Sequence, residues 1–193
     1  MNRLLVTALS LLLSGSLLQG CAGVVVGGAA VTATAVHDRR TLGVFIEDQT
    51  IEFKAADRLA SDPEIKANSH INVTSYNMVV LLTGQTSNEE LRHRAEQLVA
   101  GVERVRRVVN EVEIGSIASL GERTRDAGLV AEIKFKLTGI DLPDFDPLRV
   151  KVVVERGVVY LMGLLTHKEA DAVTDLVRHV SGVRRVVKVF EYY

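Results

Sequence analysis

Few side chains in this sequence could do chemistry. Cys21 is the only cysteine, and the five histidines are spread along the chain as His37, His70, His93, His167 and His179. No two of them have the His-x-x-x-His spacing that places metal ligands on one face of a helix. No glycine-rich loop joins a strand to a helix in the way that a phosphate cradle requires. The sequence therefore predicts a protein that is not an enzyme and that holds neither a metal nor a cofactor.

Cys21 follows a segment with the layout of a secretory signal peptide. Arg3 supplies an early positive charge, and an apolar run follows from 4 to 18. The stretch Leu18-Gln19-Gly20-Cys21 resembles the bacterial lipobox, in which the cysteine sulfur receives diacylglycerol. We therefore expect a lipoprotein leader over 1–20 and a lipid on Cys21. The alternative is that Cys21 is a small apolar residue inside the signal core.

Acylation would hold the chain on a membrane. At roughly 0.8 kcal/mol per buried methylene, two or three acyl chains such as palmitate hold a protein on a bilayer. Ala22 stands where an inner-membrane retention aspartate would follow the cysteine, which favours the outer membrane, with the body of the protein at its periplasmic face. Residues 22–36 are uncharged, rich in Gly, Ala and Val, and too short to span a bilayer. We expect a lipidated N-terminus and flexible tether over 21–46.

The charge balance argues against a nucleic-acid partner. The 193 residues carry a formal net charge of −1, whereas binding a polyanion needs a basic face that displaces counterions. The chain also lacks tryptophan and has few other aromatic residues on which bases could stack.

The rest of the chain is a tandem duplication. Val79 to Gly84 and Val158 to Gly163 are both apolar runs that stop at a glycine, and the residues around them match at a spacing of nearly eighty. Such runs are typical of buried strands. Domains of about 65 residues bury only roughly 60% of their unfolded surface, so packing of one copy on the other would stabilise both.

Each copy has the same predicted order of elements. In the first copy, Ile51, Ala55 and Leu59 recur every four residues and predict a helix, and two strands follow over 71–76 and 79–83. Ser87 and Glu90 then suggest a capping box at the start of a second helix. A last strand is predicted over 105–114. The second copy repeats this order. A hairpin followed by a crossover helix gives a mixed sheet. We predict domains over 47–114 and 126–193, with a Gly- and Ser-rich linker over 115–125.

The order of elements, the glycines Gly84 and Gly163, and the Val-x-x-Val steps at 102–105 and 180–183 resemble BON domains. The resemblance implies an α+β fold of two tandem αββαβ BON domains, each a three-stranded mixed sheet with two helices on one face. With the lipobox, the pair is similar to outer-membrane lipoproteins with two BON domains. That implies a non-enzymatic protein that supports envelope integrity, is associated with the division site, and binds anionic phospholipid of the outer membrane through its second BON domain.

Two positions depart from the family pattern. Met78 stands at the hairpin position that Gly157 fills in the second copy, so we expect Asn77 to take the unusual backbone angle there. The resemblance also implies an aromatic lipid contact at the start of the second domain's first helix, where this sequence has Gly128.

The same helix offers a substitute contact. On a helical wheel Leu129, Ile133 and Leu137 point inward, whereas Lys134 and Phe135 point away, as expected for a ring at the acyl boundary beside an ammonium at the phosphates. The lipid-binding candidates are Leu129, Val130, Lys134 and Phe135. The alternative is that Phe135 packs on the first domain or the linker.

Paired arginines and a possible protein partner complete the sequence predictions. The basic residues near the last strands form either an anion-attracting patch or a solvated strand edge: Arg104, Arg106, Arg107, Arg178, Arg184, Arg185 and Lys188. The alternative function is a periplasmic adaptor whose sheets or repeat interface bind an envelope protein without lipid selectivity.

Overall fold

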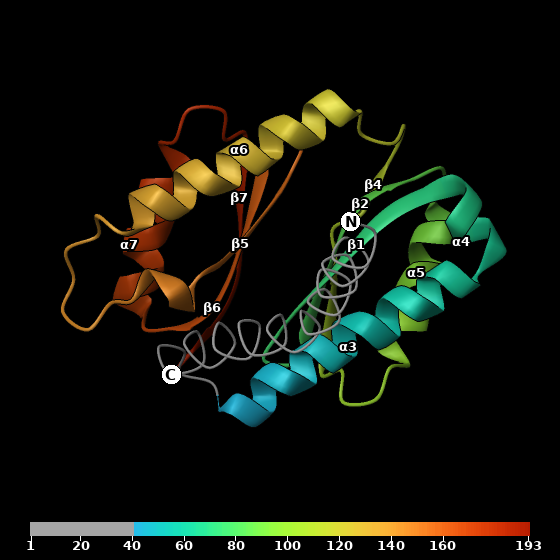
Figure 1. Ribbon diagram of the computed structural model, residues 1–193, viewed down its shortest axis with the longest axis horizontal. Coiled ribbons are helices and arrows are strands. Elements are labelled where there is room, and N and C mark those ends of the chain that lie inside the picture. The colour runs from blue at the N-terminus through green and yellow to red at the C-terminus, as the bar shows by residue number, and fades with distance from the viewer. Residues whose placement is uncertain (1–40) are drawn as a thin grey trace, which may run out of the picture. The chain divides into compact units, whose positions relative to one another are not determined.

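The computed structural model describes residues 41–193, in which the duplication is visible as two similar halves (Figure 1). The predicted leader, Cys21 and most of the tether lie outside the described residues. The first repeat contains α3 (Leu42–Ser61), α4 (Pro63–Asn68), β1 (Ser69–Tyr76), β2 (Val79–Thr86), α5 (Glu89–Ala100), β3 (Arg107–Asn110) and β4 (Glu113–Ile114). The second contains α6 (Leu120–Leu137), a 3-10 turn (Pro147–Arg149), β5 (Lys151–Glu155), β6 (Val158–Leu165), α7 (His167–Arg178) and β7 (Arg185–Tyr192).

Both sheets have the predicted mixed topology. In each repeat the hairpin strands are antiparallel, and the strand that follows the crossover helix runs parallel to the second hairpin strand, which therefore lies in the middle. The helices of each repeat cover one face of its own sheet. The prediction of an α+β fold with two mixed sheets is confirmed. The second repeat has the predicted three strands and two helices, whereas the first has an additional short helix, α4, and a fourth strand, β4.

The third strand of the first repeat is interrupted. After Asn110 the backbone leaves the ladder and resumes pairing with β2 only at Glu113. The Asn110 side-chain oxygen accepts the Val112 amide at 3.2 Å, and Val112 is buried in the core beneath the helices. The predicted continuous strand over 105–114 is thus divided because Val112 turns toward the core.

Three helix starts differ from the sequence predictions. α3 begins at Leu42, so the last residues of the predicted tether are helical, and Thr41 Oγ1 accepts the Val44 amide at 3.3 Å as its cap. The N-cap of α5 is Asn88, not Ser87. α6 begins at Leu120, inside the predicted linker, because Ser119 and Glu122 form a capping box that outweighs the glycines nearby.

A carboxylate from the first helix holds each hairpin turn. Asp48 accepts the amides of Asn77 and Met78 at 2.8 and 2.7 Å and the Ser75 hydroxyl at 2.6 Å. In the second repeat, Asp126 accepts the two turn amides at 2.8 and 3.0 Å. The prediction that Asn77 takes the unusual backbone angle is confirmed, and Met78 takes one as well. Asn77 and Met78 both have positive φ, 52° and 62°, because the Asp48 carboxylate bonds both amides in that geometry.

The glycine that ends each apolar run allows close approach of neighbouring backbone, from β1 at Gly84 and from the 3-10 turn before β5 at Gly163. A Cβ at Gly84 would lie 2.0 Å from the His70 carbonyl oxygen, and one at Gly163 would lie 2.8 Å from the Arg149 carbonyl oxygen. Any larger residue would push the hairpin apart at these points.

The second faces of the two sheets are buried against each other. Val80 and Leu82 of β2 face the helices, whereas Leu81 on the other face joins a cluster with the second sheet. The second repeat contributes Tyr160 and residues beside it. The full cluster is Tyr76, Val79, Leu81, Val158, Tyr160, Met162 and Val189. The two repeats therefore form one structure in which paired sheets lie between two layers of helices.

Polar bonds cross the same interface. Gln85 Nε2 donates to Glu155 Oε1 at 2.7 Å, and Gln85 Oε1 accepts the Ala118 amide at 2.8 Å. Lys151 Nζ pairs with Glu52 Oε1 at 2.8 Å nearer the rim. These bonds satisfy the buried polar groups and fix the register of the two sheets.

Substituting Asp48 by alanine should destabilise the fold. The change leaves two turn amides and the Ser75 hydroxyl without their charged acceptor, which costs roughly 3 kcal/mol. Asp57→Ala, at an exposed position of the same helix, should change stability by less than about 0.5 kcal/mol. Urea unfolding of both variants checks this, and equal midpoints would contradict the role given to Asp48.

Truncating Tyr160 should loosen both repeats together. Tyr160→Ala empties a fully buried site between the sheets, with an expected cost of about 3–5 kcal/mol. Because the cluster is shared, amide hydrogen exchange should accelerate in β2 as well as in β6. Exchange that accelerates only in the second repeat would show that the repeats unfold independently.

Candidate functional site

Within residues 41–193 we find no group of three or more His, Cys, Asp and Glu side chains that could hold a metal ion. In the same range no helix is long and apolar enough to cross a bilayer. The features that stand out are an exposed apolar face on a helix and a charged pocket beside it.

The outward face of α6 carries large apolar side chains in water. Leu120 is 78% exposed and Phe135 is 77% exposed, at the two ends of the helix. Between them, exposed small residues recur at helical spacing on the same face. We call this face the α6 stripe: Leu120, Thr124, Ala127, Ala131 and Phe135. It extends roughly 22 Å along the helix axis.

The flanks of the stripe are mostly basic. α6 contains four basic and three acidic residues. Two of the acids, Glu122 and Asp126, bond inward to the helix start and the hairpin turn. The third, Glu132, lies 3.7 Å from Lys136. Arg123 and Lys134 therefore border the apolar face on one side without an ion pair among the described residues.

The first helix of the other repeat also has exposed apolar residues. Leu42, Ile46 and Phe53 of α3 lie at helical spacing on its outward face, and Phe53 is 75% exposed. This helix carries four acidic and two basic residues. Because the sheets lie between the helix layers, the outward faces of α3 and α6 point in opposite directions.

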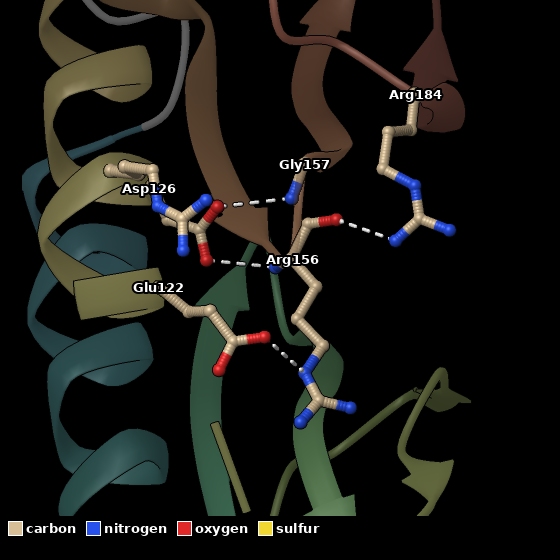
Figure 2. A pocket seen from close by; sticks show the side chains of 6 residues that line it. Glu122, Asp126, Arg156, Gly157 and Arg184 are labelled. Carbon is tan, nitrogen blue, oxygen red and sulfur yellow. Dashed lines mark hydrogen bonds and ion pairs between the residues drawn. The ribbon is translucent and has the colours of Figure 1, made fainter. Parts of the chain in front are cut away.

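A charged pocket of 440 Å³ lies where α6 meets the second hairpin turn (Figure 2). It is lined by Glu122, Arg125, Asp126, Arg156, Gly157 and Arg184. Hydrogen bonds from Ser119, together with the positive charges of Arg156 and Arg125, hold the pKa of Glu122 below its ordinary value. Arg156 also donates to the Ser116 carbonyl at 2.6 Å and so ties the turn to the segment between the repeats.

The BON domain model matches residues 47–116 and 125–192, which is most of the described chain. The chain belongs to the BON-domain family. The matched segments agree with the two repeats and confirm the resemblance inferred from the sequence.

Two relatives extend the comparison beyond the domain. The chain is 39% identical over 185 residues to the outer membrane lipoprotein DolP of Haemophilus influenzae, covering 95% of each chain. It is 35% identical over 155 residues to a 21 kDa hemolysin of Actinobacillus pleuropneumoniae, covering 80% of this chain and 79% of that one. These similarities support an outer-membrane lipoprotein with two BON domains.

The likeness to solved structures is weak. CdsD, a structural protein of the type III secretion system of Chlamydia trachomatis, is 18% identical and superposes with a TM-score of 0.29 over 76% of this chain and 63% of that one. A similarity at this level has no bearing on function.

The structure separates the four candidate lipid-binding residues. Leu129 is only 8% exposed and belongs to the core of the second BON domain, and Val130 is half-buried. Lys134 and Phe135 are exposed. Phe135 does not pack on the first BON domain or the linker, because most of its ring lies in solvent.

Sequence reasoning missed Leu120 and misplaced Gly128. Gly128 lies in the middle of α6, eight residues after its first residue. Leu120 was assigned to the linker, although the Ser119-x-x-Glu122 pattern marks a helix start. If the helix is started at Leu120, Leu120 and Phe135 fall on the same outward face.

Two of the four paired arginines, Arg106 and Arg185, form ion pairs, whereas Arg107 and Arg184 form none with the described residues. Arg104, Arg106 and Arg185 each pair with a glutamate, at 2.9, 3.1 and 3.4 Å. Arg178 pairs with Asp175 at 2.6 Å. In the first BON domain Arg104 and Arg106 are thus neutralised, whereas Arg107 at the start of β3 is not.

Removing the Ser119 hydroxyl should change the titration of Glu122. Ser119→Ala deletes the largest cause of the depressed pKa, so the pKa of Glu122 should rise toward its ordinary value. Ionised Glu122 contributes stability at neutral pH that is lost as the pH falls through its depressed pKa, and the variant should lack most of this contribution at neutral pH. An NMR titration of the side-chain carboxyl measures the pKa directly, and an unchanged value would contradict this assignment.

Proposed function

We propose that this chain is an outer-membrane lipoprotein, acylated on Cys21, whose second BON domain contacts anionic phospholipid through the α6 stripe. The observation that carries the proposal is the pair of exposed side chains Leu120 and Phe135, set in a small-residue face with basic flanks. The sequence before Cys21 and the likeness to an outer-membrane lipoprotein support the anchor.

The contact is weak by itself. Burying a Leu or Phe side chain contributes roughly 1.5–3 kcal/mol, and each basic residue near an anionic surface adds about 1 kcal/mol. A few such terms, reduced by the cost of association, give a weak and salt-sensitive contact. The acyl anchor would confine the domain near the bilayer, so that even this contact is frequently made.

The cellular role within this proposal is non-enzymatic. The BON resemblance implies a protein that supports envelope integrity and is associated with the division site. A domain that both is anchored and touches lipid fits a role in organising the membrane rather than in converting a substrate.

The α3 face favours a second candidate function, a periplasmic protein-interaction adaptor without lipid selectivity. Phe53 and Ile46 are exposed on a helix with a net negative charge, which suits a protein partner better than an anionic bilayer. A partner cannot dock on the inner sheet faces, because they bury each other. The adaptor would therefore use helices.

Vesicle co-sedimentation of a version lacking residues 1–36 tests the lipid contact. Phe135→Ala and Leu120→Ala should each weaken binding to phosphatidylglycerol-containing vesicles by about tenfold, since each removes roughly 1.4 kcal/mol or more of apolar burial. Phe53→Ala, an equally exposed phenylalanine on α3, is the matched control and should bind as the parent does.

Lipid charge and salt separate the two candidate functions. Binding that rises with phosphatidylglycerol content and falls with salt supports the lipid contact. Equal binding to neutral and anionic vesicles, or equal losses for Phe53→Ala and Phe135→Ala, would favour the adaptor.

A further inference from the structure

The two BON domains differ in charge at equivalent places. In the second domain the pocket beside the hairpin turn presents Arg125, Arg156 and Arg184. The corresponding positions of the first repeat, nearly eighty residues earlier, are Glu47, Asn77 and Arg106. The first repeat can therefore be compared position by position with the second, and only the second has three arginines at this point.

In the first domain the equivalent place is neutral. Glu47 Oε2 pairs with Arg104 Nη1 at 2.9 Å, and Arg106 Nη1 pairs with Glu191 Oε1 at 3.1 Å. Asn77 also donates to Glu191, at 2.7 Å. No unpaired cation remains there among these described side chains.

The carboxylates around the second-domain pocket are already engaged. Asp126 accepts the two turn amides. Glu122 Oε2 accepts the Ser119 amide and hydroxyl, both at 2.7 Å, while its Oε1 lies 3.6 Å from Arg156 Nε. Glu113 approaches Arg156 only to 4.0 Å.

Guanidinium donors remain in the pocket. Arg125 Nε donates to the Gly121 carbonyl, and Arg184 Nη1 donates to the Arg156 carbonyl at 3.2 Å. Within the described residues neither arginine has a carboxylate at ion-pair distance. Arg156 Nε is buried and makes no hydrogen bond there. Figure 2 shows that Arg156 and Arg184 reach this place from the turn and from the segment before β7.

We propose that this pocket binds a phosphate group, as a phosphomonoester or phosphodiester. Planar guanidinium groups bind phosphate oxygens through paired, charge-assisted hydrogen bonds. Arg125 and Arg184 supply these donors, and the half-buried Arg156, whose Nε lies 3.6 Å from Glu122 Oε1, completes the lining. The volume of 440 Å³ admits a phosphate with a small substituent such as glycerol.

The pocket is a separate site from the α6 stripe. Arg125 lies roughly 120° around the helix from the centre of the stripe, at 100° per residue. A phosphate between Arg125 and Arg184 would lie beside the hairpin turn and not beneath Phe135. The inference therefore goes beyond the proposed lipid contact and does not rest on it.

Inorganic phosphate and glycerol 3-phosphate are the soluble probes. With the full-length protein in a non-ionic detergent, each should raise the unfolding temperature in a concentration-dependent way. Arg125→Glu places in the pocket the residue type found at position 47 of the first repeat, and it should weaken the apparent affinity about tenfold or more. Arg123→Glu makes the same charge change on the same helix outside the pocket and should have less than about a twofold effect.

Arg184→Gln is a second pocket variant. Because Arg184 also holds the turn carbonyl, its unfolding temperature without phosphate is measured first. Its response to added phosphate should then be smaller than that of the parent. A full response in both Arg125→Glu and Arg184→Gln would overturn the site.

Phosphatidylglycerol vesicles distinguish the two sources of the phosphate group. Lys54→Glu, the same charge change on α3 away from the stripe and the pocket, is the vesicle control. If Arg125→Glu binds vesicles less well than Lys54→Glu, the group belongs to a lipid headgroup; if only the soluble probes respond, it belongs to a free phosphate ester. The double variant Leu120→Ala, Phe135→Ala should lose vesicle binding yet keep its response to the soluble probes. The site is overturned if neither probe stabilises the parent and Arg125→Glu and Lys54→Glu bind vesicles equally.

Discussion

The structure depends on the burial of both faces of two small sheets. One αββαβ unit can cover only one face of its sheet with helices, and the apolar run of its middle strand leaves the other face in water. Packing Leu81 of one repeat near Tyr160 of the other removes this exposure. Burial raises the pKa of Tyr160 above its ordinary value, so its hydroxyl stays neutral inside the shared core. Once the sheets are paired, only helices, turns and strand edges remain for contact with other molecules.

This constraint explains where the exposed apolar and charged side chains lie. Each first helix has an inward row of apolar residues that anchors it, and an outward row that is free to vary. In α3 the anchored row includes Ile51 and Ala55, and in α6 it includes Leu129 and Ile133. The outward rows differ in charge, because nothing in the fold specifies them. The same holds at the hairpin turns, where Asp48 and Asp126 perform one structural task while the residues beside them have diverged.

Much of the fold could be predicted from periodicity. The strands of both hairpins, the inward faces of the helices and the mixed topology follow from side-chain spacing and from the order of elements. Helix starts are harder to predict, since Asn88 and Ser119 compete with nearby residues of similar capping ability. Because the start of α6 was not recognised, Leu120 was not recognised as a helical residue. The Asp48 bonds to a turn about thirty residues away, and the pairing of the two sheets, depend on contacts that no local pattern records.

The pairing of the sheets also bears on how such a chain could have arisen. Val79 and Leu81 in one repeat and Val158 and Tyr160 in the other are equivalent positions of the duplicated sequence, so the interface joins like surfaces, as in a twofold-symmetric dimer. A single-copy ancestor could have associated through this face with a second molecule of itself. Fusion into one polypeptide would make that association independent of concentration. It would also allow the helix sequences of one half to diverge from those of the other.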